Sequence, residues 1–214
     1  MFVSQMYDLK LFIIWAAVIV AALVLHEISH AFTAYLLGDY TAKLNGRLSL
    51  NPLKHLDPIG TICLLLFGFG WAKPVPVRVL YFKNPKRDMA IVAIMGPVSN
   101  FLMAFIGAIL LGLSCAIFSS GFVLSIFFDF FIQVNILLGI FNLIPLPPLD
   151  GSRVLMYFLP AKTYMKVAQY ERYTFIGLIV LSYLGILMPV IDFFRVPLVK
   201  FFFSIGQAVF NIIS

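Results

Sequence analysis

The chain has 214 residues, of which 62% are hydrophobic and 11% are charged, and its mean hydropathy is +1.03. Soluble proteins carry about a quarter charged residues, so this composition excludes an ordinary soluble domain and predicts an integral membrane protein. In a soluble protein the net charge of +6 would suggest nucleic-acid binding, but here the basic residues separate apolar segments and encode membrane orientation. We expect one membrane-embedded domain over residues 1–214, a lipid bilayer around it and no nucleic-acid partner.

The apolar segments predict an all-α polytopic membrane protein, because a crossing helix needs about 20 apolar residues. The predicted spans are residues 9–37, 88–118, 122–144 and 173–194. Gly38 follows the first of them, as is typical of a helix C-terminus. Residues 197–213 are barely long enough to cross, so the prediction is about four to five transmembrane helices.

The region between the first and second spans is expected to hold a re-entrant or β-hairpin loop. Alternating polarity predicts a short strand over residues 43–50, and residues 61–72 are apolar but too short to cross. Prolines restrict residues 73–82, "KPVPVRVLYF", to an edge strand or an extended loop.

With these spans, twelve of the fifteen Lys and Arg residues fall on one side of the membrane. They are Lys43, Arg47, Lys54, Lys73, Arg78, Lys83, Lys86, Arg87, Arg153, Lys162, Lys166 and Arg172. The positive-inside rule predicts that this side is cytoplasmic and that the N-terminus lies outside. The stretch "HEISH" of the first helix should then lie toward the cytoplasmic side, roughly 14 Å from that face at 1.5 Å per residue.

"HEISH", residues 26–30, places two histidines and a glutamate in an otherwise apolar helix. His26 and His30 are four residues apart, so they share a helix face and can both bind one Zn²⁺. Glu27 would reach a water on that metal and take its proton as general base during attack on a carbonyl. The alternative is that the three groups only pack between helices, although insertion scales put a charged group at membrane depth at about 2.5–3.5 kcal/mol.

A catalytic zinc needs a third protein ligand and an open position. The candidates are Asp57, His55, Asp129, Asp192 and Asp150. Asp150 follows the proline-broken end of the third span, and unwound backbone at membrane depth is tolerated only when it is buried in protein or lines a wet cavity. Asp150 is therefore favoured, and a plain Asp-Gly turn is the alternative.

Three motifs together resemble the site-2 protease family of intramembrane zinc metalloproteases. They are "HEISH" in the first long helix, "MGPVSN" in the second and "NLIPLPPLDG" after the third. The resemblance covers about residues 20–160 and is to the short bacterial and archaeal type without PDZ or CBS domains. It implies His26, His30 and Asp150 as zinc ligands, one zinc per chain and Glu27 as general base. It also implies that Asn142 holds substrate or stabilises an oxyanion, for which an interhelical hydrogen bond is the alternative.

The resemblance further implies an endopeptidase that cleaves peptide bonds in or near transmembrane helices of single-span substrates. Such a helix must unwind, and residues 45–50 or 73–79 could capture the extended form as an edge strand, or else be a hairpin that covers the site. The alternative function is a metal-binding or ion-transporting membrane protein without protease activity. His55 has no assigned role here, since a surface or hydrogen-bonded loop histidine explains it as well as a site residue.

Overall fold

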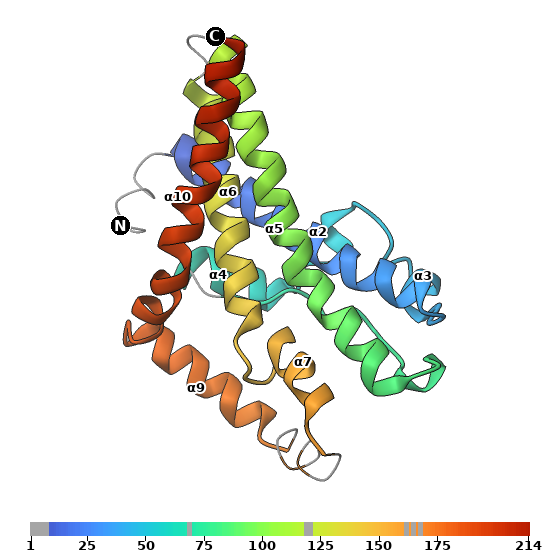
Figure 1. Ribbon diagram of the computed structural model, residues 1–214. Helices are drawn as coiled ribbons and strands as arrows, with labels where there is room; N and C mark the ends of the chain where they lie inside the picture. Colours follow the sequence, from blue (N-terminus) through green and yellow to red (C-terminus); the bar gives the residue numbers. More distant parts are fainter. Residues whose placement is uncertain (1–8, 68–69, 118–121, 161–162, 164–165, 167–168) are drawn as a thin grey trace.

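Figure 1 shows the computed structural model, which describes residues 9–67, 70–117, 122–160, 163, 166 and 169–214. Within these ranges, four helices are long and apolar enough to cross a membrane. They are α2 (Leu9–Leu36), α5 (Pro85–Ile117), α6 (Phe122–Leu143) and α10 (Leu187–Ile213). The protein is thus a helical multi-pass membrane protein, as its composition predicts.

Helices α5, α6 and α10 pack together as a bundle, and α2 packs across α5 and α6 (Figure 1). The bundle core is built from small residues of α5 against branched and aromatic residues of the other two helices. Its buried members include Ala104, Ala108, Ile132, Ile136 and Phe202. Small residues let helix backbones approach closely, which is the usual basis of helix packing in membranes.

Large apolar side chains cover the outside of the same helices. Ile13 on α2, Leu102 on α5, Val123 on α6 and Phe193 on α10 are each more than half exposed. A water-soluble protein rarely exposes so much apolar surface, whereas lipid tails are a good solvent for it.

Long apolar helices coincide with the first three predicted spans to within a few residues, but residues 173–194, predicted as the fourth span, do not form one helix. Helix α9 covers only Glu171–Tyr183, and residues 184–186 separate it from α10. Gly185 has a φ of +70°, and its N–H and that of Ile186 donate back to the carbonyls of Ser182 and Leu181. This is a Schellman-type helix end, which glycine adopts without steric strain. The doubtful segment 197–213 instead belongs to the long helix α10.

Short helices replace most of the predicted hairpin between α2 and α5. They are α3 (Thr41–Leu44), η1 (Pro52–Lys54), α4 (Pro58–Phe67) and η2 (Val79–Tyr81). The predicted strand over 43–50 is wrong, because Thr41–Leu44 forms a helical turn and turns and bends follow it. Among the described residues, β pairing is reduced to one antiparallel bridge between Leu56 and Ala72.

The predicted apolar segment 61–72 begins within α4, and its residues 68 and 69 lie outside the described ranges. Its re-entrant placement stays a prediction. Residues 73–78 after it form neither helix nor strand, which agrees with the extended loop expected from Pro74 and Pro76.

Arg47 holds this loop region together. Its guanidinium donates hydrogen bonds to the carbonyls of Lys54 and Lys73, and to that of Pro74 at 3.0 Å. The sequence placed Arg47 among the cations of one membrane side, yet it is only 4% exposed. Burial lowers the pKa of its guanidinium and the Glu27 carboxylate acts in the opposite direction, so the side chain keeps its charge.

We expect Arg47→Met to destabilise the loop region by about 2–4 kcal/mol, because a buried charged donor to three carbonyls is lost. The measurement is thermal unfolding in detergent together with limited proteolysis between residues 45 and 80. Arg78→Met is the matched control, since Arg78 is exposed. Equal unfolding temperatures for Arg47→Met and wild type would contradict this role of Arg47.

Candidate metal centre

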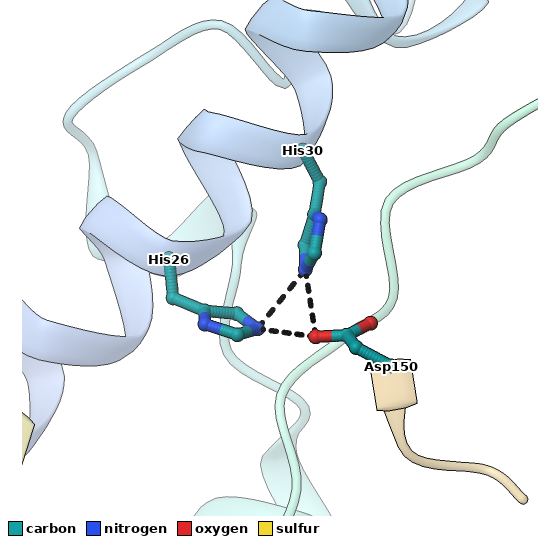
Figure 2. A group of neighbouring side chains, drawn as sticks. All are labelled: His26, His30 and Asp150. Atoms are coloured by element: carbon teal, nitrogen blue, oxygen red, sulfur yellow. Dashed lines mark hydrogen bonds and ion pairs between the residues drawn. The ribbon is translucent and has the colours of Figure 1, made fainter. Parts of the chain in front are cut away.

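Three side chains from two helices meet beside the bundle. His26 and His30 project from α2, and Asp150 is the first residue of α7 (Asp150–Phe158). The Oδ2 atom of Asp150 lies 3.2 Å from Nε2 of each histidine, and the two Nε2 atoms are 3.0 Å apart (Figure 2). Both histidines are buried. Among the described residues, this is the group of His, Cys, Asp and Glu side chains that could hold a metal ion.

The spacing of these three atoms fits zinc. Ligands at 2.0–2.1 Å from a tetrahedral ion lie about 3.3 Å from one another, close to the distances observed here. The Asp150 Oδ2 atom is buried and has no hydrogen-bond partner in the described structure, so its only close polar neighbours are the two imidazole nitrogens. A buried carboxylate oxygen in this position is well suited to a cation.

The Nδ1 atom of each imidazole, which points away from Asp150, contacts a side chain or a backbone carbonyl of α5. His26 Nδ1 contacts Oδ1 of Asn100 at 2.7 Å, and His30 Nδ1 contacts the carbonyl oxygen of Val92 at 2.8 Å. Both contacts leave Nε2 facing Asp150. Metal-binding histidines in proteins are oriented in this way through their second nitrogen.

Gly96 of α5 lies directly against both imidazole rings. A Cβ atom at this position would be 2.4 Å from Cε1 of His30 and 2.5 Å from Cε1 of His26. The Ser29 hydroxyl, between the two histidines in sequence, contacts the carbonyl oxygen of Met95 at 3.0 Å. Glycine at this position therefore permits a close approach of α5 to both histidine side chains.

The proline-rich break after α6 brings Asp150 beside the two histidines. Residues 144–149 leave the helix in turns, and the chain becomes helical again at Asp150. A carboxylate in the first turn of a helix is favoured by the helix dipole. Burial would raise the pKa of the Asp150 carboxyl, but the positive charge that the imidazoles of His30 and His26 can carry 3.2 Å away lowers it below its usual range. Asp150 therefore stays ionised, which is the form that binds a metal.

The three side chains open into a cavity of about 1080 Å³. Glu27 and Asn142 line the same cavity, so it brings together the five residues to which the family resemblance gives a role. Asn142 donates a hydrogen bond from Nδ2 to the carbonyl of Leu138, 3.0 Å away on its own helix, rather than to another helix.

Two segments outside the bundle also line the cavity. Pro74, Val75 and Val77 come from the extended loop, and α9 supplies residues from Glu171 to Leu178. Trp71 meets Phe175 of α9 edge to face, with ring centroids 5.6 Å apart.

The other candidates for a third ligand have separate structural partners. Asp129 accepts a hydrogen bond from Gln133, and Asp192 pairs with Arg195 at 2.7 Å. Asp57 accepts from the backbone N–H of Gly60. His55 is buried rather than on the surface, and its Nε2 contacts the Ser49 carbonyl at 2.7 Å.

Sequence reasoning missed the residues that do not face the metal centre but hold the histidine and the loop that do. Asn100 and Asn135 are fully buried and linked to each other and to His26, and Arg47 holds the loop that lines the cavity. The available signal for the two asparagines was an amide in the middle of an apolar span, which usually faces another helix. Arg47 gave no comparable signal, because its sequence neighbourhood is like that of a surface cation.

A helical multi-pass membrane protein with a buried His–His–Asp group that fits zinc belongs to the class of membrane metalloproteins. The model of peptidase family M50 matches residues 115–184. The chain is 44% identical over 212 residues to "Putative zinc metalloprotease YwhC" of Bacillus subtilis, with 94% of this chain and 96% of that protein covered. We conclude that the chain belongs to peptidase family M50, the site-2 proteases, whose relatives are named as zinc metalloproteases.

Two further relatives are more distant. "Putative zinc metalloprotease Rip2" of Mycolicibacterium smegmatis is 32% identical over 194 residues, which cover 86% of this chain and 70% of that protein. "Putative zinc metalloprotease MJ0611" of Methanocaldococcus jannaschii is 27% identical over 154 residues, covering 71% and 73%. No solved structure matches the chain. The resemblance seen in the sequence motifs is confirmed, and zinc is the cofactor that these names support.

We expect Gly96→Ala to lower the zinc content of the purified protein strongly, because the added methyl group would displace both imidazoles. The measurement is metal analysis of the protein in detergent. Gly177→Ala on α9 is the matched control, since its Cβ would meet nothing within 4 Å. Normal zinc content in Gly96→Ala would mean that the contact with the rings does not constrain them.

Proposed function

We propose that the protein is an intramembrane zinc endopeptidase that cleaves peptide bonds in or near transmembrane helices of single-span membrane proteins. The observation that carries this proposal is the meeting of three metal-binding atoms, within 4.8 Å of one another, in a large cavity that Glu27 also lines. Membership of family M50 supports the protease chemistry. We treat residues 1–214 as one membrane-embedded catalytic domain.

In this proposal His26, His30 and Asp150 would hold a zinc ion through the three atoms that face one another. Zinc held there would lower the pKa of a coordinated water toward about 7 and polarise a peptide carbonyl. Glu27 accepts the proton of the attacking water as general base and can return it to the leaving amine. Glu27 is not one of the three ligand residues, so its carboxylate is available as a base. It also interacts electrostatically with Arg47 of the loop region.

Asn142 and the extended loop are proposed to handle the substrate. Asn142 shares the cavity with the ligand group, and its amide can donate to a carbonyl oxygen or to the charge that develops on it. In the described part of the chain, no backbone hydrogen bond involves the amides of Val75 and Val77, whose side chains line the cavity. This loop is therefore free to pair with an unwound substrate segment by β-augmentation. Residues 45–50, the other candidate edge, lie in a turn and bends instead.

The proposed orientation puts the N-terminus outside and the cavity toward the cytoplasm. Its support is the distribution of Lys and Arg, twelve of which fall on one side of the predicted spans. Arg153 and Arg172 of this set line the cavity. Cleavage there would release a fragment on the cytoplasmic side.

We expect Glu27→Gln to keep zinc and to lose cleavage by roughly 10²–10⁴-fold, because it removes the base but not a ligand. The measurement is co-expression with a panel of single-span substrates and quantification of the cleaved product. Glu171→Gln, which alters another carboxylate of the cavity, is the matched control. Equal cleavage by Glu27→Gln and wild type would exclude the proposed mechanism and favour a metal-binding or ion-transporting protein.

We expect wild type to hold about one zinc per chain and Asp150→Ala to hold much less, because a third ligand is lost. Zinc is measured by elemental analysis after dialysis against a weak chelator. Asp192→Ala serves as control, since Asp192 pairs with Arg195 instead. Full retention of zinc in Asp150→Ala would require another residue as the third ligand.

A further inference from the structure

A chain of buried polar contacts runs from the metal centre through the apolar interior. His26 Nδ1 lies 2.7 Å from Oδ1 of Asn100, and Asn100 Nδ2 donates to Oδ1 of Asn135 at 2.9 Å. Asn135 Nδ2 in turn donates to the backbone carbonyl of Phe131 at 2.8 Å. These hydrogen bonds thus join α2, α5 and α6, and both asparagines are completely buried. Amides are expensive to place among apolar helices unless their hydrogen bonds are made.

The far end of this chain fixes the direction of every hydrogen bond in it. A backbone carbonyl can only accept, so the Asn135 group that faces Phe131 must be its NH₂. The Asn135 oxygen then faces Asn100 and requires the NH₂ of that residue. The Asn100 oxygen is left for His26, and it can only accept the proton of Nδ1.

This direction decides which nitrogen of His26 is available to a metal. A neutral imidazole carries its proton on one nitrogen, so a proton on Nδ1 leaves the lone pair on Nε2, the atom that faces Asp150. If the Asn100 amide were rotated by half a turn, its NH₂ would face Nδ1 and the ring proton would move to Nε2. His26 could then not bind a metal through the atom that faces the site.

Asn135 is what opposes that rotation. A rotated Asn100 would place its oxygen against the oxygen of Asn135 in a buried setting, where two acceptors cannot bond. His30 needs no such arrangement, because a backbone carbonyl, that of Val92, faces its Nδ1 directly. Of the two histidines, His26 is therefore the one whose proton position depends on side chains.

We infer that Asn100 and Asn135 are positioning residues that hold His26 in its metal-binding tautomer, with Asn135 acting through Asn100 without touching the histidine. The inference rests on the proposed function, in which His26 is a zinc ligand. It assigns a role to the "N" of "MGPVSN" in α5 and to an asparagine of α6 that carries no motif. It also predicts that the two asparagines are energetically coupled in zinc binding.

The test is the affinity of the full-length protein for zinc, measured in detergent by competition with a chromophoric chelator. We expect Asn100→Leu to weaken zinc binding by roughly 10- to 100-fold, the usual effect of losing the group that orients a histidine ligand. Asn135→Leu should also weaken it, although by less, since Asn100 can then adopt both orientations. Gln133→Leu, which removes a neighbouring amide of α6 outside the chain of contacts, should leave affinity unchanged.

A rescue separates this role from a general effect on folding. A carboxylate at position 100 has only acceptors, so it takes the His26 proton whatever lies at position 135. Asn100→Asp combined with Asn135→Leu should therefore bind zinc more tightly than Asn135→Leu alone. Asn100→Asp alone should bind less tightly than the double variant, because its oxygen opposes that of Asn135. Thermal unfolding of the zinc-free variants identifies any variant that is merely misfolded, and the comparison of the two Asn135→Leu proteins still decides the question.

The outcomes distinguish the inference from the proposed function. Loss of zinc in His26→Ala together with wild-type affinity in Asn135→Leu would overturn the role of the asparagines and leave the metal centre standing. Absence of rescue in the double variant would overturn it as well. Full zinc affinity in His26→Ala would overturn the metal centre and this inference with it.

Discussion

The burial of two imidazoles and a carboxylate among apolar helices is the constraint on which the rest of the structure depends. Each of these groups needs a polar partner at a depth where the surroundings offer none. Helix α5 meets this need by bringing Asn100 and the Val92 carbonyl to the rings and by having glycine at position 96. The crossing of α2 and α5 is therefore set by the side chains of the site as much as by apolar packing.

The site also requires segments of non-helical backbone whose polar groups still form hydrogen bonds. Asp150 reaches the histidines because three prolines after Leu143 prevent α6 from continuing, and α7 then begins with the carboxylate in its first turn. In the region between α2 and α5, Arg47 donates to the carbonyls of Lys54, Lys73 and Pro74. Irregular backbone is thus kept where it lines the cavity, which agrees with the general behaviour of membrane proteins.

Sequence patterns revealed the features whose signal is local. "HEISH" stands out because charged groups interrupt an apolar helix, and Asp150 stands out because prolines precede it. Asn100 and Asn135 are different, since what makes them partners is the register between two helices, which no single segment encodes. Their separate positions in apolar spans indicated helix contacts but not the direction of their hydrogen bonds.

The break between α9 and α10 escaped prediction for a similar reason. Residues 173–194 are almost continuously apolar, and a single glycine is common inside membrane helices. The structure ends α9 at Tyr183 through the left-handed conformation of Gly185, and Thr174 near the start of α9 donates to the carbonyl of Pro147 at 2.6 Å. The predicted hairpin is absent because Thr41–Leu44 forms a helical turn and a turn and bends follow it, so the alternating pattern over 43–50 does not become a strand.

The same break gives consecutive parts of the chain different mechanical roles. Helix α10 is anchored in the bundle through Ile191 and Phe202, whereas α9 borders the cavity and contacts Trp71 through Phe175. The turn at residues 184–186 therefore lets one continuous apolar stretch serve two purposes, because α9 can border the cavity while α10 packs in the bundle.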